Sequence, residues 1–244
     1  MKSEHKQLPW LFLLLMLLYW LWLSALLLLM GYRDSFLLIN GWHHPFLDWP
    51  MFLLTHLGDG LILTSLLALI FVRKYPAMVI NMILAVIILG LLGQLLKNTW
   101  FEGWDRPFRI FDSLAEVHSV AGYRMFHNSF PSGHSIVVSA VISTYVFSSR
   151  PGLVLQAVLA LAVMVISYTR IYVGVHFPGD VLVGTLIGLV GAWLLALTIY
   201  PRVNSWLNKL NVKNIKRLNN RLLVVAGIGL VMGIVLVILS LNHV

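Results

Sequence analysis

The chain has 244 residues, of which 59% are hydrophobic and only 11% charged, with a formal net charge of +8 and no cysteine. Soluble domains carry about 25% charged residues, so this composition excludes a water-facing globule. It also excludes a disordered chain, a collagen-like fibre and a disulfide-stapled secreted scaffold. An integral membrane protein remains, in which no thiolate and no cysteine-ligated metal takes part.

Apolar runs in chain order predict the membrane spans, each of which needs about 20 residues. Seven such runs cover residues 8–30, 50–72, 77–96, 132–147, 153–172, 178–200 and 222–241. The first run is too long for the core of a cleaved signal peptide, so we expect it to be retained. We predict an all-α polytopic membrane protein with a six-helix core in residues 1–200, a basic cytoplasmic linker in 201–221 and an additional transmembrane helix in 222–244.

The distribution of cations predicts the orientation. Seven spans put the two termini on opposite sides, and with the N-terminus inside, eleven cations fall on the inner side and six on the outer side, as the positive-inside rule requires. The inner cations are Lys2, Lys6, Arg73, Lys74, Arg150, Arg202, Lys209, Lys213, Lys216, Arg217 and Arg221; the outer ones are Arg33, Lys97, Arg106, Arg109, Arg124 and Arg170. We therefore expect a cytoplasmic N-terminus, and we attribute the net charge to topology rather than to nucleic-acid binding.

Three polar clusters interrupt the apolar pattern, at residues 97–107, 129–134 and 169–180. By the parity of the spans, all three lie on the outer side of the membrane. Segments that are far apart in the sequence can therefore converge on one site.

The middle cluster places Ser132, Gly133 and His134 at the start of a predicted helix. Unpaired backbone N–H groups and the positive end of the helix dipole make such a start a binding site for anions. Gly133 lets a ligand approach the backbone closely.

The two other clusters add groups suited to a phosphate. Arg170 offers a fork of donors for phosphate oxygens, and Lys97 and Arg106 add two further cations. Asp180 follows His176 by four residues, so the carboxylate and the imidazole share a face if this stretch is already helical.

These clusters resemble the three-part signature of the type 2 phosphatidic acid phosphatase superfamily, which reads Lys-x6-Arg-Pro, Pro-Ser-Gly-His and Ser-Arg-x5-His-x3-Asp. The second part is intact at residues 131–134, and the third is intact except that Thr169 replaces the serine. The first part departs from the pattern, because eight residues rather than six separate Lys97 from Arg106. Either the extra residues are looped out or another residue serves in place of Lys97.

The resemblance implies a membrane lipid phosphatase that needs no metal and no cofactor. His176 would attack phosphorus to give a phosphohistidine, Asp180 would hold its other ring nitrogen, and His134 would protonate the leaving oxygen and later activate water. The phosphate oxygens would be held by Lys97, Arg106, Arg170, the Ser132 hydroxyl and the Gly133 amide.

The substrate implied by the resemblance is a lipid phosphate in the bacterial inner membrane, cleaved at the outer face. We expect undecaprenyl pyrophosphate or a glycerophospholipid phosphate first, with lipid A dephosphorylation or lipid phosphotransfer as alternatives. The non-enzyme alternative is a transporter or flippase of lipid precursors. It is disfavoured because the ionisable residues gather at one face and the span centres are almost uncharged. No obligate protein partner is implied.

Three further groups of residues have two interpretations each. His56 and Asp59 either line a path for the substrate or mark a capped helix start, which we favour. The outer-loop aromatic residues form either a membrane-anchoring belt, which we favour, or a lipid-chain pocket; they are Trp100, Phe101, Trp104, Phe108 and Phe111. Metal binding by His118, His127 and His134 is disfavoured, because no partner stands at helical ligand spacing.

Overall fold

The computed structural model describes residues 8–111 and 116–242, which form helices and connecting loops only. The two cations Lys2 and Lys6 lie outside the described residues. The helices are α1 (Trp10–Asn40), α2 (Pro45–Thr55), the short 3-10 helix η1 (His56–Gly58), α3 (Gly60–Phe71), α4 (Pro76–Thr99), α5 (Pro107–Ile110), α6 (Gly133–Ser149), α7 (Leu153–Tyr172), α8 (Pro178–Thr198), α9 (Tyr200–Asn208) and α10 (Val212–Asn242).

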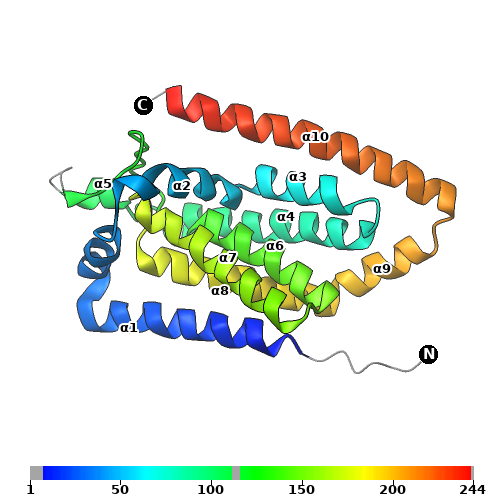
Figure 1. Ribbon diagram of the computed structural model, residues 1–244, viewed down its shortest axis with the longest axis horizontal. Coiled ribbons are helices and arrows are strands. Elements are labelled where there is room, and N and C mark those ends of the chain that lie inside the picture. Colours follow the sequence, from blue (N-terminus) through cyan, green and yellow to red (C-terminus); the bar gives the residue numbers. More distant parts are fainter. Residues whose placement is uncertain (1–7, 112–115, 243–244) are drawn as a thin grey trace.

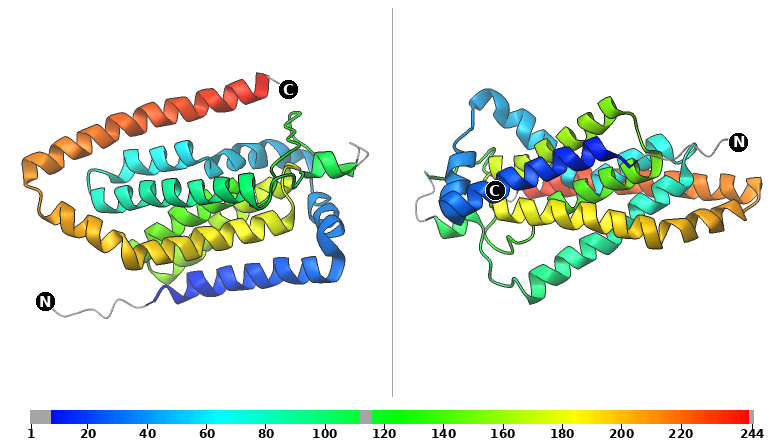
Figure 2. Two further views of the ribbon diagram at one scale, coloured as in Figure 1. Left: turned by 180° about the vertical axis from the view of Figure 1, so that it is seen from behind. Right: turned by 90° about the horizontal axis from the view of Figure 1, so that it is seen from below.

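The long helices lie side by side as a bundle (Figure 1). Helices α1 and α10 form its two opposite flanks, and α3, α4, α6, α7 and α8 lie between them, as the reverse view also shows (Figure 2). Helix α1 begins at one end of the bundle and α10 ends at the other, which agrees with termini on opposite sides. The predicted all-α polytopic fold is thus confirmed.

Five described helices are long and apolar enough to cross a membrane, namely α1, α4, α7, α8 and α10. The run predicted at 50–72 is instead a pair of helices, α2 with η1 and then α3, bent by 77°. Asp59 causes the break, because its Oδ1 accepts hydrogen bonds from the backbone N–H groups of Leu61 (2.8 Å) and Ile62 (3.1 Å) and so starts a new helix. Helix α6 is apolar but has only 17 residues.

Two segments differ in extent from the expected ones. The run that ends at Met30 is followed by a second helical segment up to Asn40, and the two segments meet at a kink at Gly31, whose φ of 79° is in the left-handed region. The segment 201–221, expected as a linker, folds into α9 and the first turns of α10.

Helices α6 and α8 touch through their backbones. A Cβ atom added to Gly188 of α8 would lie 2.5 Å from the carbonyl oxygen of Ile136 in α6, and one added to Gly184 would lie 2.7 Å from that of Ser132. The Ser139 hydroxyl donates to the carbonyl of Thr185 at 2.7 Å. Small residues spaced by four are typical of tight packing between membrane helices. This contact holds the starts of α6 and α8 next to each other.

The three polar clusters gather at one end of the bundle, where α5 lies and where α1 turns (Figure 1). The turns from α3 to α4 and from α6 to α7 lie at the other end. The predicted convergence of the clusters is therefore present in the fold.

Candidate active site

Side chains from all three clusters meet at this end. The elements that carry them are the last turn of α4 (Lys97), the residue before α5 (Arg106), the first turn of α6 (His134), the last turn of α7 (Arg170), the α7–α8 loop (His176) and the first turn of α8 (Asp180). All of these side chains are buried except that of His134, which is partly exposed. Burial of so many ionisable groups is costly, which indicates a functional site rather than ordinary packing.

His176 lies in the turn before α8 and Asp180 in the first turn of that helix, so the two do not share a helix face, because Pro178 begins the helix. The Nδ1 atom of His176 lies 3.0 Å from Asp180 Oδ2, and its Nε2 atom lies 3.3 Å from Nη1 of Arg106. A guanidinium can only donate, so Nε2 is the acceptor and Nδ1 carries the proton. The lone pair of His176 Nε2 therefore points toward Arg106.

Asp180 is fixed by three donors besides His176. They are the hydroxyls of Ser129 and Tyr32 and the backbone N–H of Phe177, the last at 3.0 Å. Four donors around a fully buried carboxylate suit its ionised form, which only accepts hydrogen bonds. Asp180 is thus held in place to orient the imidazole.

Lys97 and Arg106 meet at one backbone carbonyl in spite of their unusual spacing. Lys97 Nζ donates to the oxygen of Asn128 at 2.7 Å, and Arg106 Nη2 donates to the same oxygen at 3.3 Å. Helix α4 ends at Thr99, and the chain then reverses through Gly103, whose φ is 83°. The extra residues are therefore looped out, as the first of the two interpretations requires.

Arg170 retains an unused donor. Its Nη1 donates to the Thr55 hydroxyl at 2.7 Å, and its guanidinium lies 5.7 Å from the ring centre of Tyr123. Its Nε is buried and has no hydrogen-bond partner. A buried donor without a partner is unfavourable, and an anionic oxygen would satisfy it.

The start of α6 is open to a ligand. Ser132 caps the helix, since its hydroxyl oxygen accepts from the backbone N–H (3.4 Å) and the hydroxyl (2.9 Å) of Ser135, which leaves its own proton available. A Cβ atom built on Gly133 would meet nothing within 4 Å. His134 packs against η1. A Cβ atom added to Gly58 of η1 would lie 2.9 Å from the Cβ atom of His134.

The electrostatics of the site favour an anion. Burial lowers the pKa of His176 well below its usual range, and the charges of Arg106, Lys97, Arg170 and His134 lower it further. Burial, followed by the charge of Arg170, lowers the pKa of Arg106 to about 10. A phosphate dianion would relieve the repulsion among these cations.

Sequence reasoning missed several residues of this site. Tyr32, Thr55 and Gly58 were not identified with a role, and Ser129 was seen only as part of its cluster. Asp59 caps α3, as favoured, and the ring of His56 lies 5.0 Å from the ring of Phe52.

The outer-loop aromatic residues and the histidines considered for metal binding lie in different surroundings. Phe108 and Phe111 are buried, with the Phe111 ring 5.5 Å from that of Phe36, whereas Trp100 is 79% exposed. The outer-loop aromatic residues are thus divided between core and surface. His118 and His127 pair at 2.9 Å with Asp48 and Asp105 respectively, rather than joining His134.

Comparison with known proteins gives several similarities. The family model of the PAP2 superfamily matches residues 78–204, more than half of the chain. The lipid A 4'-phosphatase of Porphyromonas gingivalis is 30% identical over 175 residues, which are 67% of this chain and 71% of that protein. The putative undecaprenyl-diphosphatase YbjG of Escherichia coli is 32% identical over 113 residues, 42% of this chain and 52% of that protein.

Two solved structures are also similar. LpxE of Aquifex aeolicus gives a TM-score of 0.59 at 34% identity, over 68% of this chain and 94% of that one. The phosphatidylglycerolphosphate phosphatase of Bacillus subtilis gives 0.50 at 23% identity, over 81% and 96%, a likeness in fold alone.

Proposed function

Since the chain belongs to the PAP2 superfamily and is a membrane lipid phosphatase, we propose that it removes a phosphate monoester from a glycolipid of the lipid A class at the outer face of the membrane. Support for this class comes from the lipid A 4'-phosphatase of P. gingivalis, whose similarity extends over more of both chains than that of YbjG. We therefore rank lipid A ahead of undecaprenyl pyrophosphate and glycerophospholipid phosphates, which reverses the order expected from the sequence.

The orientation of the His176 ring is the observation that carries the mechanism. Its Nε2 lone pair points toward Arg106, while Asp180 accepts the proton of Nδ1. In the first step Nε2 forms a bond to phosphorus, the bond from phosphorus to the lipid oxygen breaks, and protonated His134 gives its proton to that oxygen. The carboxylate of Asp180 stabilises the positive charge that develops on the phosphorylated imidazole.

The second step returns the site to its starting state. His134, now neutral, takes a proton from a water molecule whose oxygen bonds to phosphorus, and the bond from phosphorus to Nε2 breaks. Phosphate is released, His176 regains its lone pair and His134 is protonated again.

Charge stabilisation is the largest contribution expected in this scheme. The equatorial oxygens would lie among Lys97, Arg106 and Arg170, with the unpartnered Nε of Arg170 as one donor. The Ser132 hydroxyl and the Gly133 N–H at the start of α6 would supply two more.

A phosphate-release panel tests this proposal on the purified full chain. Its substrates are lipid A, undecaprenyl pyrophosphate, phosphatidylglycerol phosphate and phosphatidic acid, with His176→Ala as the blank. We expect kcat/KM for lipid A to exceed that for each other lipid by about tenfold or more, since 1.4 kcal/mol of selective binding gives a factor of ten. Faster cleavage of undecaprenyl pyrophosphate would overturn the choice of substrate.

A further inference from the structure

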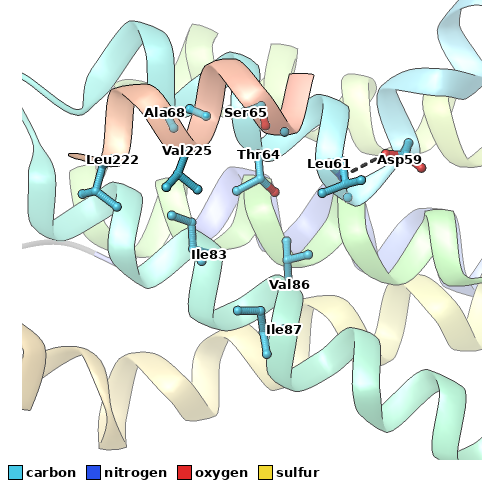
Figure 3. A pocket seen from close by; sticks show the side chains of 13 residues that line it. Asp59, Leu61, Thr64, Ser65, Ala68, Ile83, Val86, Ile87, Leu222 and Val225 are labelled. Atoms are coloured by element: carbon cyan, nitrogen blue, oxygen red, sulfur yellow. Dashed lines mark hydrogen bonds between the residues drawn. The ribbon is translucent and has the colours of Figure 1, made fainter. Parts of the chain in front are cut away.

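A groove lies between α3, α4 and α10 (Figure 3). Its volume of about 400 Å³ falls within the range of sites that bind small molecules. Three helices supply its mainly apolar walls, and the side chains from α4 point toward those of α3 and α10 (Figure 3). They include Leu61 and Ala68 of α3, Ile83 and Ile87 of α4, and Leu222 and Val225 of α10.

Two of the three walls, α3 and α10, lie outside the residues that match the family model. The family match ends at residue 204, before α10 begins at Val212. Helix α10 approaches α3 closely at Gly229, where a Cβ atom would lie 2.6 Å from the Ser65 hydroxyl oxygen. The groove thus depends on a helix outside the matched core.

One end of the groove adjoins the candidate active site. Asp59 and Gly60 line that end. The residue just before them, Gly58, packs against the His134 side chain, and a Cβ atom on Gly60 would lie 3.7 Å from the Val137 side chain, one turn after His134.

The length of the groove matches one leaflet of the bilayer. Along α3 it extends from Asp59 to Ala68, which is ~14 Å at the helical rise of 1.5 Å per residue. The hydrocarbon core of a bilayer is about 30 Å thick, so the groove reaches to about its middle. Thr64 lines the groove, and its buried hydroxyl has no hydrogen-bond partner. The carbonyl at the head of an acyl chain could accept from it.

We propose that this groove holds one acyl chain of the same lipid whose phosphate is cleaved, and so selects substrates by chain length. The inference rests on the proposed function, because it requires a lipid phosphate at His176. The chain enters at the Asp59 end, next to His134, and runs along α3 toward the middle of the bilayer. Its apolar surface is thereby buried against Leu61, Ile87 and Val225.

A pair of matched variants tests the groove. Val225→Trp fills it, whereas Val224→Trp places the same indole on the neighbouring residue, which is equally exposed at 62% but does not line the groove. The substrates are synthetic diacyl glucosamine phosphates with two fourteen-carbon or two six-carbon chains. We expect wild type and Val224→Trp to prefer the long chains by about tenfold in kcat/KM, and Val225→Trp to lose most of that preference with its short-chain rate unchanged. Equal chain-length preference in the two variants would overturn the proposed role of the groove, whereas the proposed function would be unaffected.

Photolabelling tests whether the groove holds an acyl chain, and it does so independently of catalysis. It applies even if the wild-type protein releases no phosphate, which is the result that would overturn the proposed function. The probe is the fourteen-carbon compound with a diazirine near the end of one chain, bound to full-length His176→Ala. We expect adducts in residues 83–87 and 222–229, and their loss when Val225→Trp is added. Equal labelling of these residues by a diazirine phosphatidylcholine of the same chain length would show that bulk lipid fills the groove and would overturn the inference.

Discussion

The reactivity of His176 depends on which of its ring nitrogens carries the proton. Asp180 fixes the proton on Nδ1, and Arg106 approaches Nε2 as a donor at 3.3 Å. Because Asp180 is itself held by Tyr32 and Ser129, the ring has little freedom to rotate or to change tautomer. One nitrogen is therefore kept ready for phosphorus before any substrate arrives.

Replacement of the two histidines should impair different steps. With p-nitrophenyl phosphate, whose leaving group needs no general acid, His134→Ala should still form the phosphohistidine but hydrolyse it about 10²–10⁴-fold more slowly. The expected result is a burst of p-nitrophenol and acid-labile phosphate on the protein. His176→Ala should show neither signal, and a burst of normal size in that variant would contradict its role as nucleophile.

The pH dependence of kcat/KM should reflect the lowered pKa of His176. Only the neutral imidazole is a nucleophile, so activity is lost as the pH falls through the pKa of the folded protein. Because that pKa lies well below its usual range, the acidic limb should lie below pH ~6.5, the value of a free histidine.

A pair of variants tests whether the nearby cations lower the pKa of His176. Arg106→Gln removes the largest charge contribution and should move the acidic limb toward higher pH, in addition to weakening substrate binding. Arg109→Gln, at an exposed position, should leave the limb in place. If the acidic limb of the pH profile does not move in Arg106→Gln, the charge of Arg106 does not lower the pKa of His176.

Among the helices, the backbone contact between α6 and α8 determines the geometry of the site. It joins the helix whose first turn holds His134 to the helix that begins just after His176. A separation of the two helices would change the distance between the two imidazoles, and a displacement of about 1 Å can cost a factor of about 10² in rate.

Gly188→Ala should therefore lower both stability and activity. Its methyl group would collide with backbone atoms of α6 at 2.5 and 2.8 Å, and overpacking of this kind typically costs about 1–3 kcal/mol. The matched control is Gly90→Ala in α4, where a Cβ atom would meet nothing within 4 Å. We expect thermal unfolding in detergent to shift down by several degrees only in Gly188→Ala, and equal shifts in both variants would contradict the argument.

Apolar runs predicted the order of the helices, but they did not reveal the breaks within them. The run that stops at Met30 ends where Gly31 breaks α1, and a second helical segment then continues through Arg33 and Asp34 to Asn40. Hydropathy measures burial in lipid, whereas helix ends depend on caps and on backbone hydrogen bonds. For the same reason the single run at 50–72 did not reveal the cap at Asp59.

At the scale of the whole molecule, the parity of the spans was sufficient to bring the three clusters together. The motif residues could be found because each cluster is continuous in the sequence. Tyr32 and Thr55 could not, since their partners Asp180 and Arg170 lie 148 and 115 residues away and neither residue belongs to one of the three clusters. Such contacts depend on how the helices pack.

The orientation in the membrane stays a prediction, and the absence of cysteine makes it easy to test. Glu102→Cys is at the end that carries the candidate site, and Ser149→Cys is at the opposite end, both at exposed positions. A membrane-impermeant maleimide should label Glu102→Cys in intact spheroplasts and Ser149→Cys only after permeabilisation, as the positive-inside rule requires. The reverse pattern would place the site on the cytoplasmic side.

The shortness of α6 bears on how the lipid meets the enzyme. With 17 residues α6 covers ~25 Å, about 5 Å less than the hydrocarbon thickness, and longer helices surround it. The surrounding helices absorb this hydrophobic mismatch, so the start of α6 can sit a few ångströms beneath the headgroup plane. A lipid phosphate would then reach His134 by sinking slightly rather than by being lifted out of the bilayer, and its acyl chains would stay at membrane depth throughout catalysis.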